Sequence, residues 1–141
     1  AVLRVALFGA LDPKDPRTRS TLAAVERELG RGDLIYRYRM DDGLDGDEGT
    51  FTACAFWRVG CLALDGRTAE AKAAFERLIA RGNDVGLFAE EIDPETGDQR
   101  GNTPQGFSHM ALINAALRLE SSIERYGLAD PAEAEERRAA E

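Results

Sequence analysis

The helical segments of this chain are of two kinds, and the two kinds alternate along the sequence. Residues 2–9, 51–64 and 107–117 are apolar on nearly every side, whereas residues 18–29 and 69–80 carry a single apolar stripe. A helix that is apolar all round must be covered all round, and a helix with one apolar stripe belongs at the surface. The sequence therefore predicts an all-α fold in which inner and outer helices alternate.

The connections between these helices are unequal in length. Residues 65–67 join an inner helix to the next outer helix by a short turn, while long polar segments at about residues 30–49 and 82–105 lead from outer to inner helices. Long loops in a compact domain often carry function. Because both loops precede inner helices, we expect them to meet at one end, where the helix N-termini are positively polarised. This arrangement favours part of an α/α toroid over a four-helix bundle, whose helices would each carry one stripe.

The length of 141 residues is that of one domain. We expect residues 1–127 to form the portion of the toroid and residues 128–141, rich in Glu, Arg and Ala, to form a charged C-terminal helix or tail. No strand is expected beyond a short extended piece within residues 34–40. Because the chain opens on Ala1 inside a helical apolar pattern, we expect further sequence to precede it.

Charge and composition argue against several classes of partner and cofactor. The chain has 18 basic and 26 acidic residues, a net charge of −8, and such a chain is a poor ligand for nucleic acid. It has no apolar run long enough to span a membrane. Cys54 and Cys61 lack the spacing of a zinc site and are expected to be reduced core residues. We expect no metal and no cofactor.

The second long loop contains two adjacent carboxylates, Glu90 and Glu91, with apolar residues before and after them. This setting could desolvate one carboxylate while the other meets solvent, which is one way to make a general acid or base. Residues 93–98 have the composition of a tight turn and are expected to hold the pair in place. The alternative is an ordinary solvated loop. His109 is expected to be a core or supporting residue rather than a catalytic one.

The first long loop combines aromatic and charged side chains. Residues 36–39 read Tyr-Arg-Tyr-Arg, and an acidic segment that includes Asp42 and Glu48 follows. Aromatic faces stack on sugar rings, and arginine and carboxylate groups hydrogen-bond to hydroxyls, so the loop is suited to a carbohydrate. The alternative is a surface turn with stacked side chains. The order of the acidic residues does not match a calcium-binding loop.

Many short motifs of this chain occur in an order that resembles one known family. They are Glu48 to Phe51, Phe56-Trp57, Gly66-Arg67, Phe75-Glu76, Ala89 to Asp93, Gly101-Asn102, Pro104-Gln105, Phe107 to His109 and Ala111 to Ala115. Together they resemble the C-terminal part of the bacterial glucoamylase-like and trehalase-like enzymes of glycoside hydrolase family 15. The resemblance spans most of the chain up to about Leu119.

The resemblance implies a six-fold α/α toroid and inverting, exo-acting hydrolysis of α-glucosides. It implies that Glu90 is the general base and that Arg37, with Tyr38, binds glucose. Asp42, Glu48 and Glu91 are expected to complete the polar substrate-binding rim. The general acid of the family lies upstream of these residues. The sequence leaves the choice among starch-derived, isomaltose-like and trehalose substrates open.

A fragment with half of a catalytic pair is expected to be inactive alone. It should require the missing N-terminal half of the enzyme, or self-associate through the apolar faces of its inner helices. Its localisation is open, with the bacterial cytoplasm as the expectation. The rival hypothesis is a non-enzymatic helical-repeat module, since Trp57, Leu64, Gly66, Ala71 and Phe75 loosely match a tetratricopeptide unit, although no second copy follows.

Overall fold

The computed structural model describes residues 2–40 and 48–128, so Asp42 and, apart from Leu128, the expected C-terminal helix or tail at 128–141 lie outside the described residues. Helices dominate, which confirms the predicted all-α class. They are α1 (Arg4–Leu7), α2 (Pro16–Leu29), α3 (Thr52–Asp65), α4 (Thr68–Ile79) and α5 (Gly106–Tyr126).

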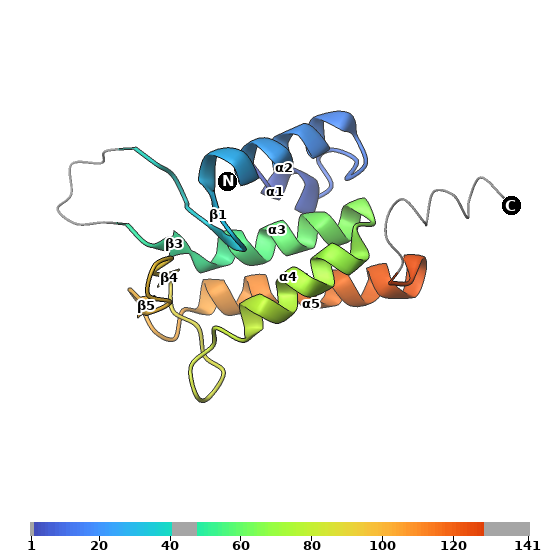
Figure 1. Cartoon of the computed structure of the whole chain (residues 1–141). Helices are drawn as coiled ribbons and strands as arrows, with labels where there is room; N and C mark the ends of the chain where they lie inside the picture. Colours follow the sequence, from blue (N-terminus) through green and yellow to red (C-terminus); the bar gives the residue numbers. More distant parts are fainter. Residues whose placement is uncertain (1, 41–47, 129–141) are drawn as a thin grey trace, which may run out of the picture.

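Helix α3 is the centre of the fold. It is packed against α1 and α2 on one side and against α4 and α5 on the other (Figure 1). Ten of its 14 residues are buried, among them Ala53, Ala55, Val59 and Leu62 with no exposed surface. Gly60 allows a close approach, because a Cβ atom there would lie 2.9 Å from Leu7 Cδ2. The helix ends at Gly66, whose φ of 85° gives the left-handed cap that glycine favours.

The two outer helices bury one stripe each, as their sequences predict. Helix α2 begins after Asp15, whose side chain accepts a hydrogen bond from the Arg17 backbone N–H, and Leu22 and Val25 form its buried face. Helix α4 buries Ala71, Ala74 and Leu78 and exposes residues such as Glu76 and Arg77. Polar outer faces of this kind need no further cover.

Helix α5 is apolar on two opposite faces. One face is buried and packs on α3 through small side chains such as Ala111 and Ala115. A buried hydrogen bond of 2.7 Å between the hydroxyls of Ser122 and Thr68 joins α5 to α4. On the other side, four large apolar side chains are between 39% and 57% exposed: Phe107, Met110, Ile113 and Leu117. We call these four residues the α5 apolar stripe.

In the described part of the chain, five short strands lie at the end of the fold where α3 and α5 begin (Figure 1). Strand β1 (Gly30–Arg31) pairs with β2 (Leu34–Ile35), and β3 (Thr50–Phe51), β4 (Glu91–Ile92) and β5 (Gln99–Arg100) form an antiparallel sheet in that order. The sheet connects the first long loop to the second, which confirms that the two loops meet at one end. Within the described residues the expectation of no strand is therefore too strict, since each strand has two residues and is too short to show alternation.

The expected helix at residues 2–9 is also shorter in the structure. Helix α1 has only four residues, and the chain leaves it at Phe8 and Gly9, where the φ of Gly9 is 71°. Val2, Val5 and Phe8 are exposed here, at 53%, 42% and 72%. A single turn of helix has little stability of its own, so its bounds depend on packing more than on pattern.

Phe56 of α3 packs against the outer helix α4 and against the second long loop, so its substitution tests this core. Its ring is 1% exposed and lies edge-on to Phe75 at 6.1 Å and to Phe88 at 5.5 Å between centroids. We expect Phe56→Ala to lower the free energy of unfolding by roughly 3–5 kcal/mol, because it removes buried surface and leaves a cavity. Denaturant titration of the 141-residue chain measures this.

Phe8→Ala is the matched control, since the same atoms are removed from a ring that is 72% exposed. Its effect should stay within about 0.5 kcal/mol. Equal losses for the two variants would contradict the assignment of Phe56 to the core.

Candidate functional site

The backbone of residues 87–90 is held by polar side chains from the surrounding segments. The Leu87 N–H donates to Asn83 Oδ1 at 2.7 Å, and the Ala89 N–H donates to Gln99 Oε1 at 2.6 Å. Gln99 Nε2 in turn donates to the carbonyls of Arg81 and Leu87. Regular secondary structure is absent at these residues, so side chains satisfy the buried backbone groups instead.

Helix α5 contributes two further contacts to this segment. Ser108 Oγ donates to the Ala89 carbonyl at 2.9 Å, and the Phe88 N–H donates to His109 Nε2 at 3.2 Å. Because Nε2 is the acceptor, this geometry requires an imidazole with its proton on Nδ1. His109 therefore lies against the loop backbone, in the supporting position expected for it.

Glu90 follows this segment and is held through both its backbone and its side chain. Its N–H donates to the Asn102 carbonyl at 3.0 Å, and its carbonyl accepts from the Thr52 N–H, also at 3.0 Å. Asn102 Nδ2 donates to Glu90 Oε2 at 3.0 Å. The carboxylate thus lies beside residues 101–102, in the segment that leads to α5.

Glu91 directs its carboxylate to a different neighbour. As the first residue of β4 it pairs with Phe51, and its Oε2 accepts from the Gly49 N–H at 3.1 Å. A Cβ atom at Gly49 would lie 3.0 Å from both Cβ and Oε2 of Glu91, so a glycine there permits this contact. The pKa of Glu91 is raised above its ordinary value, chiefly because burial disfavours the charged carboxylate. The charges of Glu48 and Glu90 raise this pKa further, while the Gly49 N–H and Arg37 lower it. The desolvation expected for one member of the pair is therefore found at Glu91.

Arg37 and Glu48 form an ion pair at the edge of the same cluster. Arg37 Nη2 lies 2.6 Å from Glu48 Oε1 and 3.5 Å from the Tyr38 hydroxyl. Its guanidinium also lies over the rings of Tyr38 and Phe51, at 5.0 and 5.2 Å from the centroids. Burial works against the charged guanidinium, but the contacts with Glu48 and Tyr38 outweigh it and raise the pKa of Arg37.

The structure thus brings together Arg37, Tyr38, Glu48 and Glu91. Glu90, the fifth of the six residues singled out from the sequence, adjoins them through Glu91, with its own carboxylate beside Asn102. Arg37, Tyr38 and Glu48 come from the first loop, and Glu90 and Glu91 come from the second. Gly49 and Phe51 connect the two sets, through the Glu91 hydrogen bond and the Arg37 contact respectively. Asp42, the sixth, lies outside the described residues. Phe51, Trp57 and Phe107 pack together at centroid distances of 5.5 to 6.4 Å beside this cluster.

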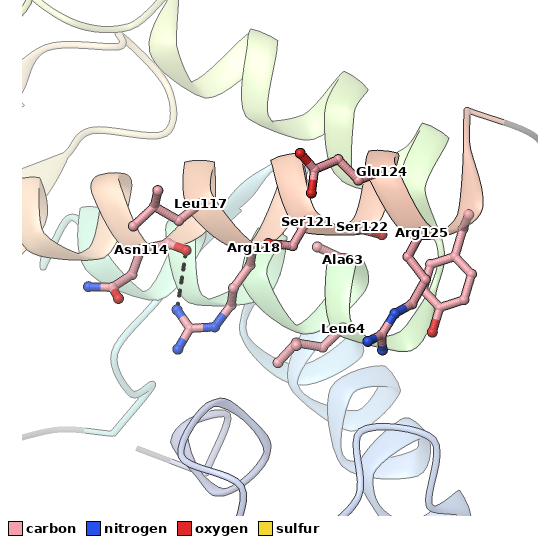
Figure 2. A pocket seen from close by; sticks show the side chains of 10 residues that line it. Ala63, Leu64, Asn114, Leu117, Arg118, Ser121, Ser122, Glu124 and Arg125 are labelled. Atoms are coloured by element: carbon pink, nitrogen blue, oxygen red, sulfur yellow. Dashed lines mark hydrogen bonds between the residues drawn. The ribbon is translucent and has the colours of Figure 1, made fainter.

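Two grooves differ in their relation to this cluster. A groove of about 360 Å³ adjoins it and is lined by Tyr36, Tyr38 and Glu48 together with Asp93 and Arg100 of the β4–β5 hairpin. A larger groove of about 780 Å³ lies along the C-terminal half of α5, where Figure 2 shows Arg118 bonded to the Asn114 carbonyl. The second groove contains none of the six candidate site residues.

Two features are absent from the described residues: a metal-binding cluster and a membrane-spanning helix. Across residues 2–40 and 48–128, no three His, Cys, Asp or Glu side chains gather in a way that could hold a metal ion. Over the same described ranges, every helix is too short or too polar to cross a bilayer.

Sequence reasoning missed the residues that hold the loop. Asn102 and Ser108 fall within motifs that the sequence does contain, but the motifs do not say which atoms they contact. Gln99 lies in no motif, and it could not have been found, because its three partners are backbone groups whose positions only the fold defines. The composition of residues 93–98 did indicate the turn, in which the Glu95 and Thr96 N–H groups donate to Asp93 Oδ1.

The raised pKa of Glu91 makes a prediction about pH and stability. A carboxyl with a pKa above its ordinary 4.5 in the folded state favours folding below that value, and this contribution is lost as pH rises through the folded-state pKa. Glu91→Gln does not titrate and keeps an acceptor for Gly49. We therefore expect the difference in melting temperature, variant minus unsubstituted chain, to grow as the pH is raised from about 4 to about 7. Circular dichroism measures both melting temperatures.

Glu76→Gln is the matched control, since it makes the same change of charge on the exposed side of α4. A pH dependence as large for Glu76→Gln as for Glu91→Gln would mean that the effect comes from net charge and not from burial at Glu91.

Comparison with known proteins places these residues in a family. The model of the family described as glycosyl hydrolases family 15 matches residues 1–117. The trehalases of Mycobacterium tuberculosis and Mycolicibacterium smegmatis are each 44% identical to this chain over 140 residues, which cover 95% of this chain and 21% of each trehalase. The trehalase of Thermoplasma acidophilum is 43% identical over 124 residues, which cover 87% of this chain and 21% of the relative.

No solved structure matches this chain. The chain spans about a fifth of the length of the curated relatives that it matches. The family match includes both long loops, the β3–β4–β5 sheet that joins them and the first half of α5. On this evidence the chain belongs to glycosyl hydrolase family 15.

Proposed function

We propose that this chain is the C-terminal portion of an inverting α-glucoside hydrolase that acts on trehalose, and that Glu90 is its general base. The observation that carries the proposal is the position of Glu90 directly before Glu91, which accepts a hydrogen bond from Gly49 beside the Arg37–Glu48 ion pair, in a chain whose relatives are named trehalases. The choice of trehalose over other α-glucosides rests on those names alone.

In this mechanism, an inverting glycosidase uses one carboxylic acid to protonate the leaving oxygen and one carboxylate to activate water on the opposite face of the sugar. Glu90 takes the proton of that water as the water attacks the anomeric carbon. The general acid belongs to another part of the enzyme, about 6.5–9.5 Å away across the substrate. The fixed loop backbone supports this role, because a base must be held in one geometry relative to the reacting atom.

Arg37 has the proposed role of holding glucose hydroxyls. Its guanidinium is already oriented by Glu48 and by the rings of Tyr38 and Phe51, while its side chain stays 42% exposed. An exposed and oriented donor can bind a hydroxyl without reorganising first. Tyr38, Glu48 and Glu91 would form the rest of the polar rim, with Asp42 as a further member.

We further propose that the α5 apolar stripe is covered by the N-terminal part of the complete enzyme. Four large apolar side chains lie exposed on one side of this helix, and contiguous exposed apolar patches often mark interaction surfaces. The opposite side of the same helix is already packed on α3. The relatives are about five times as long as the matched segment, so they contain chain enough to supply the cover and to close an α/α toroid.

Glu90→Gln in the complete enzyme tests the assignment of the base. We expect trehalose hydrolysis to fall by about 100-fold to 10,000-fold, the usual worth of a general base, with little change in KM. Glu76→Gln, which makes the same chemical change on the outside of α4, should retain full activity. An active Glu90→Gln enzyme would contradict the proposal.

The first products of the reaction distinguish inversion from retention. Inversion at one glucose of α,α-trehalose releases one β- and one α-glucose, whereas retention releases only the α-anomer, and proton NMR of fresh products resolves the two. The isolated 141 residues should show no turnover, because they lack the general acid.

The proposed cover of the α5 apolar stripe can be tested on the isolated chain. We expect the chain to self-associate in sedimentation velocity experiments, and Ile113→Asp to reduce this association by placing a charge in the stripe. Ala23→Asp, at an exposed position of α2, is the control and should leave association unchanged. A monomeric unsubstituted chain would contradict the need for a cover.

A further inference from the structure

We propose that Asn102 is a positioning residue for Glu90, which holds one oxygen of the carboxylate so that the other is presented to the attacking water. This inference rests on the proposed function of Glu90 as a base, and it assigns a task to a residue that the proposed function leaves without one.

The two residues are joined by a pair of reciprocal hydrogen bonds. The Glu90 backbone N–H donates to the Asn102 carbonyl, and the Asn102 side-chain amide donates to Glu90 Oε2, each at 3.0 Å. The backbone bond sets the separation of the two residues, and the side-chain bond then selects one rotamer of the Glu90 carboxylate. An ionised carboxylate only accepts hydrogen bonds, so it is the NH2 group of Asn102 that faces Glu90.

Gly101 makes this approach possible. Its φ is 74°, in the left-handed region that glycine favours, and a Cβ atom there would lie 3.2 Å from both Cβ and Oε2 of Glu90. The Glu90 side chain therefore lies directly against the backbone at residue 101 and has little room to swing toward it. Asn102 and Gly101 together restrict the carboxylate on one side.

The bond involves Oε2, and within residues 2–40 and 48–128 no hydrogen bond is made to Oε1, whose lone pairs can accept from water. A side-chain amide is suited to this task, because it donates to the carboxylate without carrying a charge that would weaken it as a base. The charged residues on the segments of the pair are Glu91, which follows Glu90, and Arg100, which precedes Gly101 and pairs with Glu91 in the sheet. Arg37 and Glu48 from the first loop act on Glu91.

The test uses the complete enzyme with Asn102→Ala and Asn102→Asp. Asn102 is exposed, so neither change should prevent folding. For Asn102→Ala we expect kcat to fall about tenfold with KM within about twofold, because a less fixed base lowers the rate and not the affinity. For Asn102→Asp we expect the acidic limb of the kcat/KM profile to move up by about one pH unit, since a second carboxylate beside Glu90 favours its protonated form.

Asn83→Ala is the contrasting variant, because Asn83 holds the Leu87 N–H and does not contact Glu90. It should lower the melting temperature and leave the acidic limb where it is. If the Asn102 variants behave in the same way, with a lower melting temperature and an unchanged limb, Asn102 is only structural and the inference is overturned.

A measurement that does not need turnover separates this inference from the proposed function. In protein labelled with ¹⁵N-asparagine, the Asn102 side-chain resonances, assigned by their loss in Asn102→Asp, should shift as pH is lowered and lose this shift in Glu90→Gln. A pH-independent resonance would overturn the positioning contact even in an active enzyme. A titrating resonance in an enzyme without trehalose hydrolysis would support the contact and contradict the proposed function.

Discussion

The all-round burial of α3 is the constraint on which the rest of the structure depends. A helix with Ala53, Ala55, Val59 and Leu62 fully buried must have neighbours on every side, and α1, α2, α4 and α5 are those neighbours. Its N-terminal residue then has a defined position at the end of the fold where the β3–β4–β5 sheet lies. The Thr52 N–H donates to the Glu90 carbonyl, so the candidate site is attached directly to the element that is most strongly held.

Rigidity in the second loop comes from side chains and not from strands. The sheet contributes only two residues from each strand, whereas Asn83, Gln99, Ser108 and His109 each bond to the backbone of residues 87–89. Three of these four residues carry uncharged side chains that cannot titrate. The arrangement gives the adjacent carboxylates a backbone held mainly by uncharged side chains, and the charged residues that act on Glu91 are Glu48, Arg37 and Glu90.

The helices could be predicted from the sequence because inner helices are apolar on every side and outer helices on one side only. Residues 51–64 lack a polar face, and the structure places α3 at 52–65; residues 69–80 carry one stripe, and α4 runs from Thr68 to Ile79. The apolar pattern of residues 107–117 continues in the sequence through Ile123 and Tyr126, and α5 accordingly runs to Tyr126, with Leu119 and Ser122 on its buried face. Helix α1 and the strands were less predictable, since one turn or two residues carry too little pattern to outweigh tertiary contacts.

The candidate site was predictable in its charged residues and not in its supports. Charged residues beside apolar ones can be picked out from the sequence, and the family resemblance implies roles for four of them: Arg37, Glu48, Glu90 and Glu91. The partly buried Glu91 carboxylate accepts its hydrogen bond from Gly49, whose N–H lies in the first loop, 42 residues away in the chain. No local pattern around residue 91 contains that information.

The closeness of Gly49 to Glu91 also has a consequence for variation among relatives of this chain. A side chain at position 49 would meet Cβ and Oε2 of Glu91 at 3.0 Å, so the two positions share one small volume. A relative with alanine or a larger residue at position 49 would need a shorter or differently turned side chain at position 91. The two positions should therefore vary together, although one lies in each loop and neither borders the other in sequence.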